Sequence, residues 1–343
     1  YGESFSIIKN SNVKVFAKIK SDFDGDNKSK RLRSIHTLIN GITKCVEKEK
    51  PDLLIYAGDR EEGIAASIVC NYMNILFAHI AGGDPVWGNA DDPARFAISK
   101  LAHMHLVFTK RYKQNLLNVG EEKFRICNSG NPSLDTIRKT KDLNLKQLSK
   151  NLAKKIPKDY IVLIKHPLSS EENKVDQQIK KTLTALEKFC IKNDFKTIII
   201  YPNTDPGSKK IIKNIKIYKK KNSFIVFKNL PRLEFVNLIR KAKALIGNSS
   251  MGILEAPFYK LPVVNIGNRQ RGRLNAGNVV FTNYLEKNIL KALNNACFNV
   301  EYRKKVKKIS NIYGNGYSAS KITNFIEKIN LKSKKWYIKK KLC

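Results

Sequence analysis

The sequence predicts an α/β protein with two domains, each built on a parallel β-sheet that helices cover on both faces. Short apolar runs alternate with amphipathic stretches along most of the chain, which is typical of βαβ units. Each apolar run ends at a cluster of polar residues, and the carboxyl ends of parallel strands are where ligands bind in such sheets. The length of 343 residues is about twice that of a typical domain, which favours two domains.

Residues 1–150 are assigned to the first domain, in which apolar runs predict strands and the stretches between them predict helices. Residues 13–19 also alternate like a strand, and residues 35–46 show a helical period before Pro51. The main predicted strands cover residues 52–57, 75–78, 104–108 and 124–127. The helices between them are predicted over residues 65–72, 94–103 and 111–119.

Residues 138–158 are charged and weakly periodic, and we interpret them as the linker to a second domain, residues 151–320. The predicted strands of this domain cover residues 160–164, 197–200, 224–227, 242–246 and 263–266. A helix is expected over residues 232–242, before the fourth of these strands. Residues 321–343 are expected to form a basic C-terminal tail.

Charge and cysteine content narrow the function classes. The chain carries 65 Lys and Arg against 29 Asp and Glu, for a net charge of +36, but the lysines are scattered over predicted helix faces and loops. Neither a zinc-finger spacing nor an RNA-binding aromatic motif accompanies them, so we expect no nucleic-acid partner. The 6 cysteines form no CxxC pair. No apolar run reaches the ~18 residues of a membrane helix, so we expect a cytoplasmic protein with no membrane contact.

The most informative stretch is residues 247–257, which follows the predicted strand 242–246 and opens a short helix predicted to begin at Met251. A strand that passes through glycine and serine into a helix leaves backbone N–H groups free at a positive helix end, which suits an anion. Ser249 and Ser250 can donate to a phosphate, and Glu255 can accept from the hydroxyls of a ribose. An ordinary helix N-cap explains the local pattern equally well.

Polar side chains at equivalent strand ends are expected to converge on one substrate. Each has a simpler explanation alone: Asp59 as a helix cap, His166 as a partner for a backbone carbonyl. Together their types suit one chemistry, in which carboxylates remove and return a carbon-bound proton while serines, amides and arginines hold a diphosphate leaving group. The residues are Asp59, Arg60, Asp84, Asp91, Asp92, His166, Asn203, Asp205, Ser249, Ser250, Glu255, Arg269 and Arg273.

At these residues the sequence resembles the UDP-N-acetylglucosamine 2-epimerase family, and most closely its hydrolysing branch, which supplies N-acetylmannosamine or related sugars for the synthesis of sialic-acid-type sugars such as legionaminic acid. The motifs that carry the resemblance lie in the family's order along both domains. They are residues 58–60, 79–84, 91–103, 165–167, 201–208, 247–257 and 265–273.

The resemblance implies a fold of the glycosyltransferase-B type, in which two Rossmann-like domains face each other across a cleft. It implies anti elimination of the nucleoside diphosphate from a UDP- or GDP-linked sugar, and then addition of water to the glycal. It implies no metal or other cofactor, and a homo-oligomer, either a dimer or a tetramer.

Carried over by position, the resemblance assigns catalytic roles to five residues and nucleotide or substrate binding to twelve more. The catalytic residues implied are Asp59, Asp84, Asp91, Asp92 and His166. The binding residues implied are Arg60, Asn203, Asp205, Ser208, Asn248, Ser249, Ser250, Gly252, Glu255, Arg269, Gln270 and Arg273.

The chain departs from the family pattern in two places. The family's first strand is expected before Tyr1, so the first domain is expected to lack its N-terminal strand. The family usually has a glutamate where this chain has Ala81, and a methyl group cannot carry a proton. Either Asp84 or Asp91 then takes that role, or the substrate is a different amino sugar such as a 2,4-diacetamido variant, or activity is lost. The alternatives are a retaining glycosyltransferase of the same fold and a catalytically inactive nucleotide-sugar-binding protein.

Overall fold

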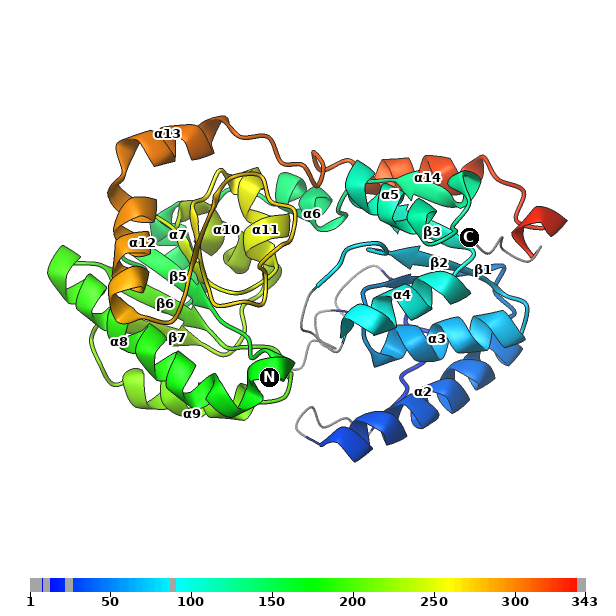
Figure 1. Cartoon of the computed structure of the whole chain (residues 1–343), viewed down its shortest axis with the longest axis horizontal. Coiled ribbons are helices and arrows are strands. Elements are labelled where there is room, and N and C mark those ends of the chain that lie inside the picture. The colour runs from blue at the N-terminus through cyan, green and yellow to red at the C-terminus, as the bar shows by residue number, and fades with distance from the viewer. Residues whose placement is uncertain (1–7, 9–12, 22–26, 87–90, 338–343) are drawn as a thin grey trace. The chain divides into compact units, whose positions relative to one another are not determined.

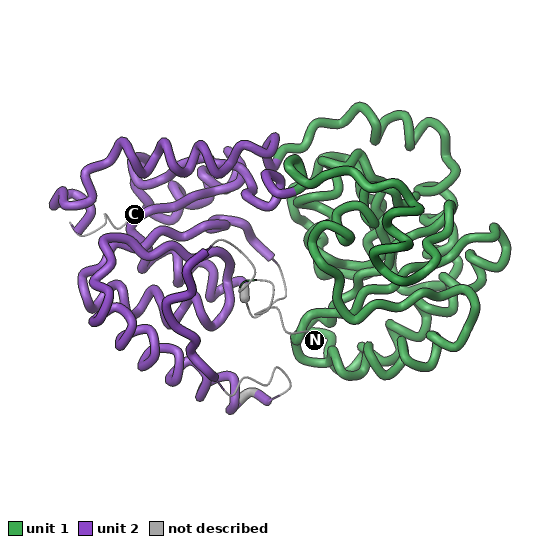
Figure 2. The backbone as a smooth tube through the Cα atoms, turned by 180° about the vertical axis from the view of Figure 1, so that it is seen from behind, with its two compact units in different colours: residues 1–12, 137–312 green, residues 13–136, 313–343 purple. Residues whose placement is uncertain are grey.

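The computed structural model of the chain describes residues 8, 13–21, 27–86 and 91–337. The chain divides into two compact units, and it leaves the second unit and returns to it (Figure 2). Unit 1 contains residues 1–12 and 137–312, and unit 2 contains residues 13–136 and 313–343. This division differs from the sequence-based one in two ways: it falls at residue 136 instead of 150, and the basic C-terminal residues belong to the unit that carries the first sheet.

Unit 2 contains a parallel sheet of 4 strands in the order β1-β2-β3-β4. The strands are β1 (Leu53–Ala57), β2 (Leu76–Ile80), β3 (Met104–Val107) and β4 (Ile126–Asn128). The helices of its first segment are α2 (Lys28–Glu49), α3 (Glu61–Tyr72), α4 (Asp91–Leu101), α5 (Lys110–Asn118), the 3-10 turn η1 (Lys123–Arg125) and α6 (Ser133–Lys139), the last of which continues into unit 1.

Two apolar cores cover the faces of this sheet. On one face, Phe77 of β2 packs with Cys70 of α3 and Ile98 of α4. On the other, Leu76 and Met104 pack with the C-terminal segment. Because neighbouring strand residues point to opposite faces, Leu76 and Phe77 enter different cores.

The C-terminal segment is therefore part of the fold of unit 2. It contains α14 (Ser318–Glu327) and the 3-10 turn η4 (Lys334–Trp336). Trp336 is almost fully buried, and Arg125 donates to its carbonyl at 3.1 Å. Ser318 and Ala319 at the start of α14 donate backbone N–H groups to Asp135 at 2.8 Å each. Residues 321–343 were expected to form a basic tail. Residues 321–337 are instead part of the fold of unit 2, because their apolar side chains pack on the sheet.

Unit 1 contains a parallel sheet of 6 strands in the order β10-β9-β8-β5-β6-β7, which places β8 and β5 at its centre. The strands are β5 (Tyr160–Ile164), β6 (Lys196–Ile200), β7 (Phe224–Phe227), β8 (Leu245–Gly247), β9 (Val263–Ile266) and β10 (Val279–Thr282). All five residues of β5 are buried, as expected for a strand covered on both faces.

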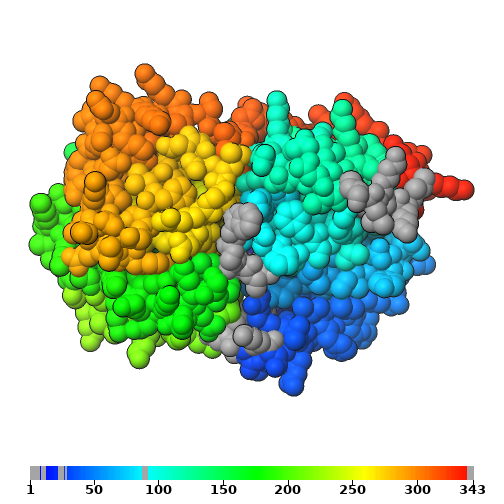
Figure 3. Space-filling model, viewed as in Figure 1, coloured from blue at the N-terminus to red at the C-terminus, as the bar shows by residue number. Residues whose placement is uncertain are grey.

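The helices of unit 1 form a layer on each side of its sheet (Figure 1). One layer contains α8 (Val175–Asn193), α9 (Ser208–Tyr218) and α12 (Glu286–Phe298). The other contains α7 (Leu145–Asn151), α10 (Arg232–Lys241), α11 (Met251–Leu254) and the 3-10 turn η3 (Ala256–Tyr259). The remaining elements are the 3-10 turn η2 (Ser169–Lys174), which leads into α8, and α13 (Val300–Lys308), which lies on the surface (Figure 3).

The predicted α/β class with two parallel sheets is confirmed. The strand expected at residues 13–19 is wrong: these residues have no strand partner, and Val13, Val15 and Phe16 are exposed. This segment instead lies along α2, where the Lys48 ammonium is 5.6 Å from the Phe16 ring centroid. Within the part of the chain that the structure describes, no helix is long and apolar enough to cross a membrane.

Candidate functional site

In unit 2, Arg95 of α4 joins three groups at the carboxyl ends of β1 and β2. Its guanidinium donates to the Asp59 carboxylate, donates to the Ala81 carbonyl at 2.8 Å, and lies 3.9 Å from an oxygen of Asp84. Arg95 and Asp84 are buried, whereas the Asp59 side chain is 21% exposed. One guanidinium therefore holds two predicted site carboxylates close together, and of these Asp59 is the one that a substrate can reach.

Asp59 is not a helix cap. The N-cap of α3 is Arg60, whose side chain makes no capping hydrogen bond, and the carboxylate of Asp59 faces Arg95 instead. The Arg60 guanidinium is about one third exposed and lies 3.8 Å from Glu61, which is already bound by Arg31 at 2.6 Å. Arg60, the residue after Asp59, therefore has a partly exposed positive charge.

His79 fixes the loop that carries Asp59, a role that sequence reasoning missed. Its Nε2 lies 2.7 Å from the Gly58 carbonyl, and its Nδ1 lies 2.9 Å from the hydroxyl of Ser99 on α4. A carbonyl can only accept, so the ring carries a proton on Nε2 and donates it to Gly58, while the Ser99 hydroxyl lies between Nδ1 and the Arg95 carbonyl, to which it can donate at 3.1 Å. The fully buried imidazole thus connects β2, the β1 loop and α4.

The turn after β2 holds Ala81, at the position of the expected glutamate, in an unusual backbone conformation. Ala81 has φ +74°, in the left-handed region that non-glycine residues rarely adopt, and it is buried. A Cβ on Gly83, at φ +75°, would lie 2.4 Å from the Tyr112 carbonyl, so this position requires glycine. The Ala81 carbonyl, rather than its side chain, faces Arg95.

The two aspartates at the start of α4 differ in what the structure shows of them. Asp91 is the first residue of the helix. Asp92 accepts a hydrogen bond from the Val86 N–H at 2.6 Å. Asp92 therefore connects the start of α4 to Val86 in the loop after β2.

In unit 1, Asn248 is the hub of the loops at the carboxyl edge of the sheet. Its side chain accepts from the His166 N–H at 2.7 Å and donates to the His166 carbonyl at 2.8 Å. Its own carbonyl accepts from Arg269 at 3.2 Å and from Gln270 at 3.1 Å. Arg273 donates to the Gln270 side chain at 2.6 Å, so both predicted arginines reach this hub.

His166 is neutral and has a defined tautomer. Its Nδ1 accepts from the Asn203 N–H at 3.1 Å, which places the ring proton on Nε2. Burial and the nearby cations Arg269 and Lys165 lower the pKa of His166 to about 3. At neutral pH it can donate one hydrogen bond to an anion but cannot carry a positive charge.

The segment of residues 203–208 flanks this hub. Asn203 donates to Asp205, and an oxygen of Asp205 lies 4.0 Å from Arg269. The buried Ser208 begins α9, and its N–H donates to the Asp205 carbonyl at 3.0 Å.

The stretch after β8 is tighter and shorter than the sequence predicted. Gly247 has φ +127°, and a Cβ there would lie 2.0 Å from the Ile164 carbonyl. The helix expected to continue from Met251 is a 4-residue α-helix followed by a 3-10 turn, because Pro257 cannot continue the hydrogen-bond ladder. A Cβ on Gly252 would lie 2.9 Å from Val263, so this glycine serves close packing on β9.

The serines and the glutamate of this stretch are accessible. Ser250 is the N-cap residue of α11, but its side chain makes no capping hydrogen bond. Ser249 and Ser250 are both partly exposed. The Glu255 carboxylate, 16% exposed, lies 3.6 Å from the Arg232 guanidinium.

Lys165 is a second group that sequence reasoning did not single out. It directly follows the apolar strand β5 and is only 3% exposed. Its ammonium lies 3.4 Å from the Tyr284 hydroxyl and 4.7 Å from the ring centroid. Burial, opposed by the Glu171 charge and assisted by the Arg269 charge, lowers its pKa to about 7. A lysine in phase with a buried strand face is the sequence signal that could have revealed it.

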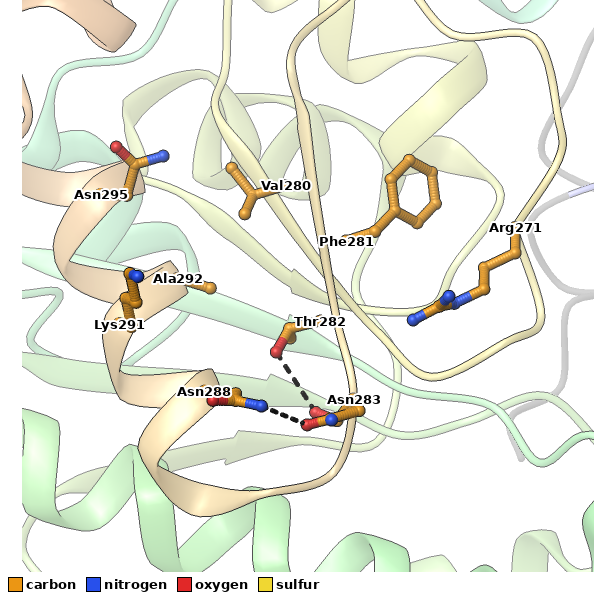
Figure 4. A pocket seen from close by; sticks show the side chains of 9 residues that line it. All are labelled: Arg271, Val280, Phe281, Thr282, Asn283, Asn288, Lys291, Ala292 and Asn295. Atoms are coloured by element: carbon orange, nitrogen blue, oxygen red, sulfur yellow. Dashed lines mark hydrogen bonds between the residues drawn. The ribbon is translucent and has the colours of Figure 1, made fainter.

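A separate cavity of about 400 Å³ lies between β10 and α12 (Figure 4). Its walls include Val280, Thr282 and Lys291, and Arg271 reaches it from the loop before β10. None of the predicted site residues lines it. Among the residues that the structure describes, no group of three or more His, Cys, Asp or Glu side chains is arranged to hold a metal ion.

Comparisons with known proteins agree with this architecture. The family model of UDP-N-acetylglucosamine 2-epimerases matches residues 1–327. A GDP/UDP-N,N'-diacetylbacillosamine 2-epimerase (hydrolyzing) of Campylobacter jejuni is 35% identical over 269 residues, which are 78% of this chain and 69% of that protein. A UDP-N,N'-diacetylbacillosamine 2-epimerase (hydrolyzing) of Legionella pneumophila is 31% identical over 333 residues, which are 97% of this chain and 86% of that protein.

Solved structures share the fold. The UDP-GlcNAc 2-epimerase from Neisseria meningitidis, whose structure is bound to UDP-GlcNAc, aligns with a TM-score of 0.77 at 22% identity, covering 90% of this chain and 84% of that one. A calicheamicin glycosyltransferase aligns with a TM-score of 0.52 at 11% identity, covering 88% of this chain and 80% of that one. The fold therefore defines a glycosyltransferase-B-like α/β protein. Within that class, the chain belongs to the UDP-N-acetylglucosamine 2-epimerase family.

Proposed function

We propose that the protein is a hydrolysing 2-epimerase, which converts a UDP-N-acetylglucosamine-type nucleotide sugar to UDP and a free N-acetylmannosamine-type sugar. The observation that carries the proposal is the accessible Asp59 carboxylate, held by a buried arginine at the sheet edge of unit 2. Unit 1 separately offers a set of donors suited to a diphosphate, centred on Asn248. The two sets supply the two halves of an elimination: a base for a carbon acid and a grip on the leaving group.

The first step removes the proton from carbon 2 of the sugar as the diphosphate leaves carbon 1. We assign Asp59 as one acid/base carboxylate and Asp91 or Asp92 as the other. The electron pair of the C–H bond becomes the C1–C2 double bond of the glycal, and the leaving oxygen takes the electrons of the C1–O bond. Arg269 and Arg273 offset its charge, and the neutral His166 donates a hydrogen bond from Nε2.

The second step adds water across the glycal. A carboxylate takes a proton from the attacking water as oxygen bonds to carbon 1, and a protonated carboxylic acid returns a proton to carbon 2 on the opposite face. The product is the free 2-epimeric sugar. The enclosed Asp84 and the non-ionisable Ala81 flank the Arg95 guanidinium, and neither is needed as a proton carrier in this scheme.

Two relatives bear names with diacetylbacillosamine, a 2,4-diacetamido sugar, as part of their substrate. We therefore propose a UDP- or GDP-linked sugar of that kind as substrate alongside UDP-N-acetylglucosamine, with the product serving sialic-acid-like or legionaminic-acid synthesis. The departure at Ala81 accords with a substrate that differs from the family's usual one.

Incubation of the full chain with each nucleotide sugar in heavy water tests the proposal. We expect free sugar that carries deuterium on carbon 2, because only elimination and re-addition exchange that hydrogen. Sugar transfer without exchange at carbon 2 would identify a retaining glycosyltransferase instead. Tight UDP binding with no turnover of any of these substrates would identify a binding protein, one of the alternatives that Ala81 raises.

A further inference from the structure

Lys165 lies where a charged side chain is costly to bury. It follows the central strand β5 in phase with Leu163, which belongs to the core beneath α8 and α12. Its neighbour His166 is one of the predicted site residues. A buried ammonium is retained in a protein only where charges or hydrogen bonds compensate its lost hydration, so its surroundings indicate its use.

Groups from three elements face the Lys165 ammonium. Tyr284, from the turn between β10 and α12, offers both its hydroxyl and its ring. Glu171 of η2 contributes a favourable negative charge, and Arg269, from the loop after β9, contributes a repulsive positive one. Burial and the Glu171 carboxylate raise the pKa of Tyr284, so Tyr284 stays neutral and supplies no charge of its own.

The same groups hold the loop of residues 267–273. Asn268 donates to Glu171 at 2.7 Å, and the other Glu171 oxygen accepts from Gln178 at 2.6 Å. Tyr284 packs so closely on Gly267, at φ +91°, that a Cβ there would lie 2.1 Å from its hydroxyl. Lys165 therefore connects through Tyr284 and Glu171 to the segment that carries Arg269, Gln270 and Arg273.

The charge balance around Lys165 changes when an anion enters. In the ligand-free protein Lys165 and Arg269 repel each other, which together with burial brings the Lys165 pKa to about 7. A diphosphate that binds Arg269 adds negative charge on the same side, and a nearby negative charge favours the ammonium form. The lone pair of the Lys165 Nζ then accepts a proton from solvent.

We propose that Lys165 is a positioning residue of the nucleotide site, which takes up a proton when a nucleoside diphosphate binds and then holds loop 267–273 through Tyr284 and Glu171. This proposal rests on the proposed function only in that unit 1 must bind the nucleotide. By linkage, a ligand whose binding takes up a proton binds more weakly as pH rises. The affinity for UDP is therefore expected to fall by up to tenfold per pH unit above about pH 7, in the range where the phosphates of UDP no longer titrate (second phosphate pKa ≈ 6).

Calorimetric titration of the full chain with UDP, at about pH 8 in buffers of different ionisation enthalpy, measures the proton uptake directly. We expect the wild type to take up a fraction of a proton approaching one, and the Lys165→Met variant to take up none. The affinity of this variant for UDP should be lower than that of the wild type and independent of pH above about 7, as linkage requires. The matched control is Lys154→Met, because the Lys154 ammonium also lies over an aromatic ring of unit 1, 5.1 Å from the Phe227 centroid. This variant should keep wild-type uptake.

The outcomes separate this proposal from the proposed function. UDP binding without proton uptake in the wild type, or with unchanged uptake in Lys165→Met, would overturn the role of Lys165 and leave the epimerase proposal standing. If neither UDP nor GDP binds, both the role of Lys165 and the epimerase proposal are rejected. If the Lys165→Met variant does not fold, the Glu171→Gln variant provides a second test. Loss of the Glu171 charge should make UDP affinity lower than in the wild type, and affinity should begin to fall at a lower pH.

Discussion

Asn248 binds the backbone of His166 twice, accepting from its N–H at 2.7 Å and donating to its carbonyl at 2.8 Å. This side chain takes the place of a strand-to-strand backbone pair just beyond the ends of β8 and β5. Asn248 fixes His166 and loop 267–273 relative to each other, because its carbonyl also accepts hydrogen bonds from Arg269 and Gln270.

Replacing Asn248 by alanine should weaken UDP binding at least tenfold and lower the free energy of unfolding by about 1–3 kcal/mol, since two buried backbone groups lose their partner. Asn214→Ala is the matched control, because the buried Asn214 also makes two hydrogen bonds in unit 1, to Asp176 at 2.8 Å and to the Lys210 carbonyl at 2.9 Å. It should cost similar stability in urea denaturation while UDP affinity in calorimetry is unchanged. Equal losses of affinity in both variants would show that Asn248 acts through stability alone.

Replacing Asp59 by asparagine should reduce turnover by a factor of about 10²–10⁴, the range for loss of a general acid or base, while UDP binding stays within a few-fold. The amide can still accept from Arg95, so the fold should be kept. Rates of UDP release from the nucleotide sugar, together with calorimetry, separate the two effects. Wild-type turnover in this variant would remove Asp59 from the mechanism.

Replacing both Ser249 and Glu255 by alanine should weaken UDP binding by roughly 2–4 kcal/mol, the size of a few hydrogen bonds to charged or buried partners. The variant also removes the ion pair between Glu255 and Arg232 at 3.6 Å, which is partly exposed, so the loss of stability should be at most about 1 kcal/mol. Affinity is measured by calorimetry and stability by thermal unfolding. An unchanged affinity would mean that this stretch is only a tight turn.

Gly247→Ala should destabilise the protein by more than about 3 kcal/mol, combining a forbidden backbone angle with a clash against the Ile164 carbonyl. Gly277→Ala is the control: Gly277 has φ +91°, but a Cβ there has nothing within 4 Å. It should cost only the backbone strain, about 1–2 kcal/mol. If urea denaturation gives equal losses for the two variants, the clash at Gly247 relaxes at no cost.

Stability should depend on pH over two separate windows in unit 1. Lys165 has a pKa of about 7 in the folded chain against 10.5 when unfolded, so the unfolded state holds more protons and stability falls as pH falls from 10.5 to 7. His166 has a pKa of about 3 in the folded chain against 6.5 when unfolded, so stability also falls as pH falls from 6.5 to 3. Each slope is at most about 1.4 kcal/mol per pH unit. Urea denaturation should show that Lys165→Met removes the first slope and is more stable than wild type at pH 7, while His166→Gln removes only the second.

The parallel sheets could be predicted from the sequence because strands buried on both faces are nearly pure apolar runs, as β5 and β6 are. Strand β10 was not predicted, although its four residues all favour strands, because they follow a loop rich in glycine and asparagine; its pairing with β9 shows that they form one. The alternation in residues 13–19 misled for the opposite reason, since an alternating pattern forms a strand only where a neighbour pairs with it.

The residues of the candidate site could be listed from the polar clusters at the strand ends, but not their individual surroundings. Nothing in the sequence distinguishes the enclosed Asp84 from the accessible Asp59, because the difference comes from how α4 packs. For Lys165 the only signal is its phase with the buried face of β5, since its partner Tyr284 lies over a hundred residues away along the chain. Lysines are so frequent in this chain that one buried lysine has no compositional signal.

Unit 2 takes its last layer from residues near the other end of the chain, with Trp336 seated against Leu76 and Met104. During synthesis on the ribosome, its sheet emerges long before the helix and tryptophan that cover one face. The apolar face formed by Leu76 and Met104 must then stay uncovered while all of unit 1 is made. A nascent chain halted after unit 1 is therefore expected to bind chaperones through that face, and release is expected only once the segment up to Trp336 has left the exit tunnel.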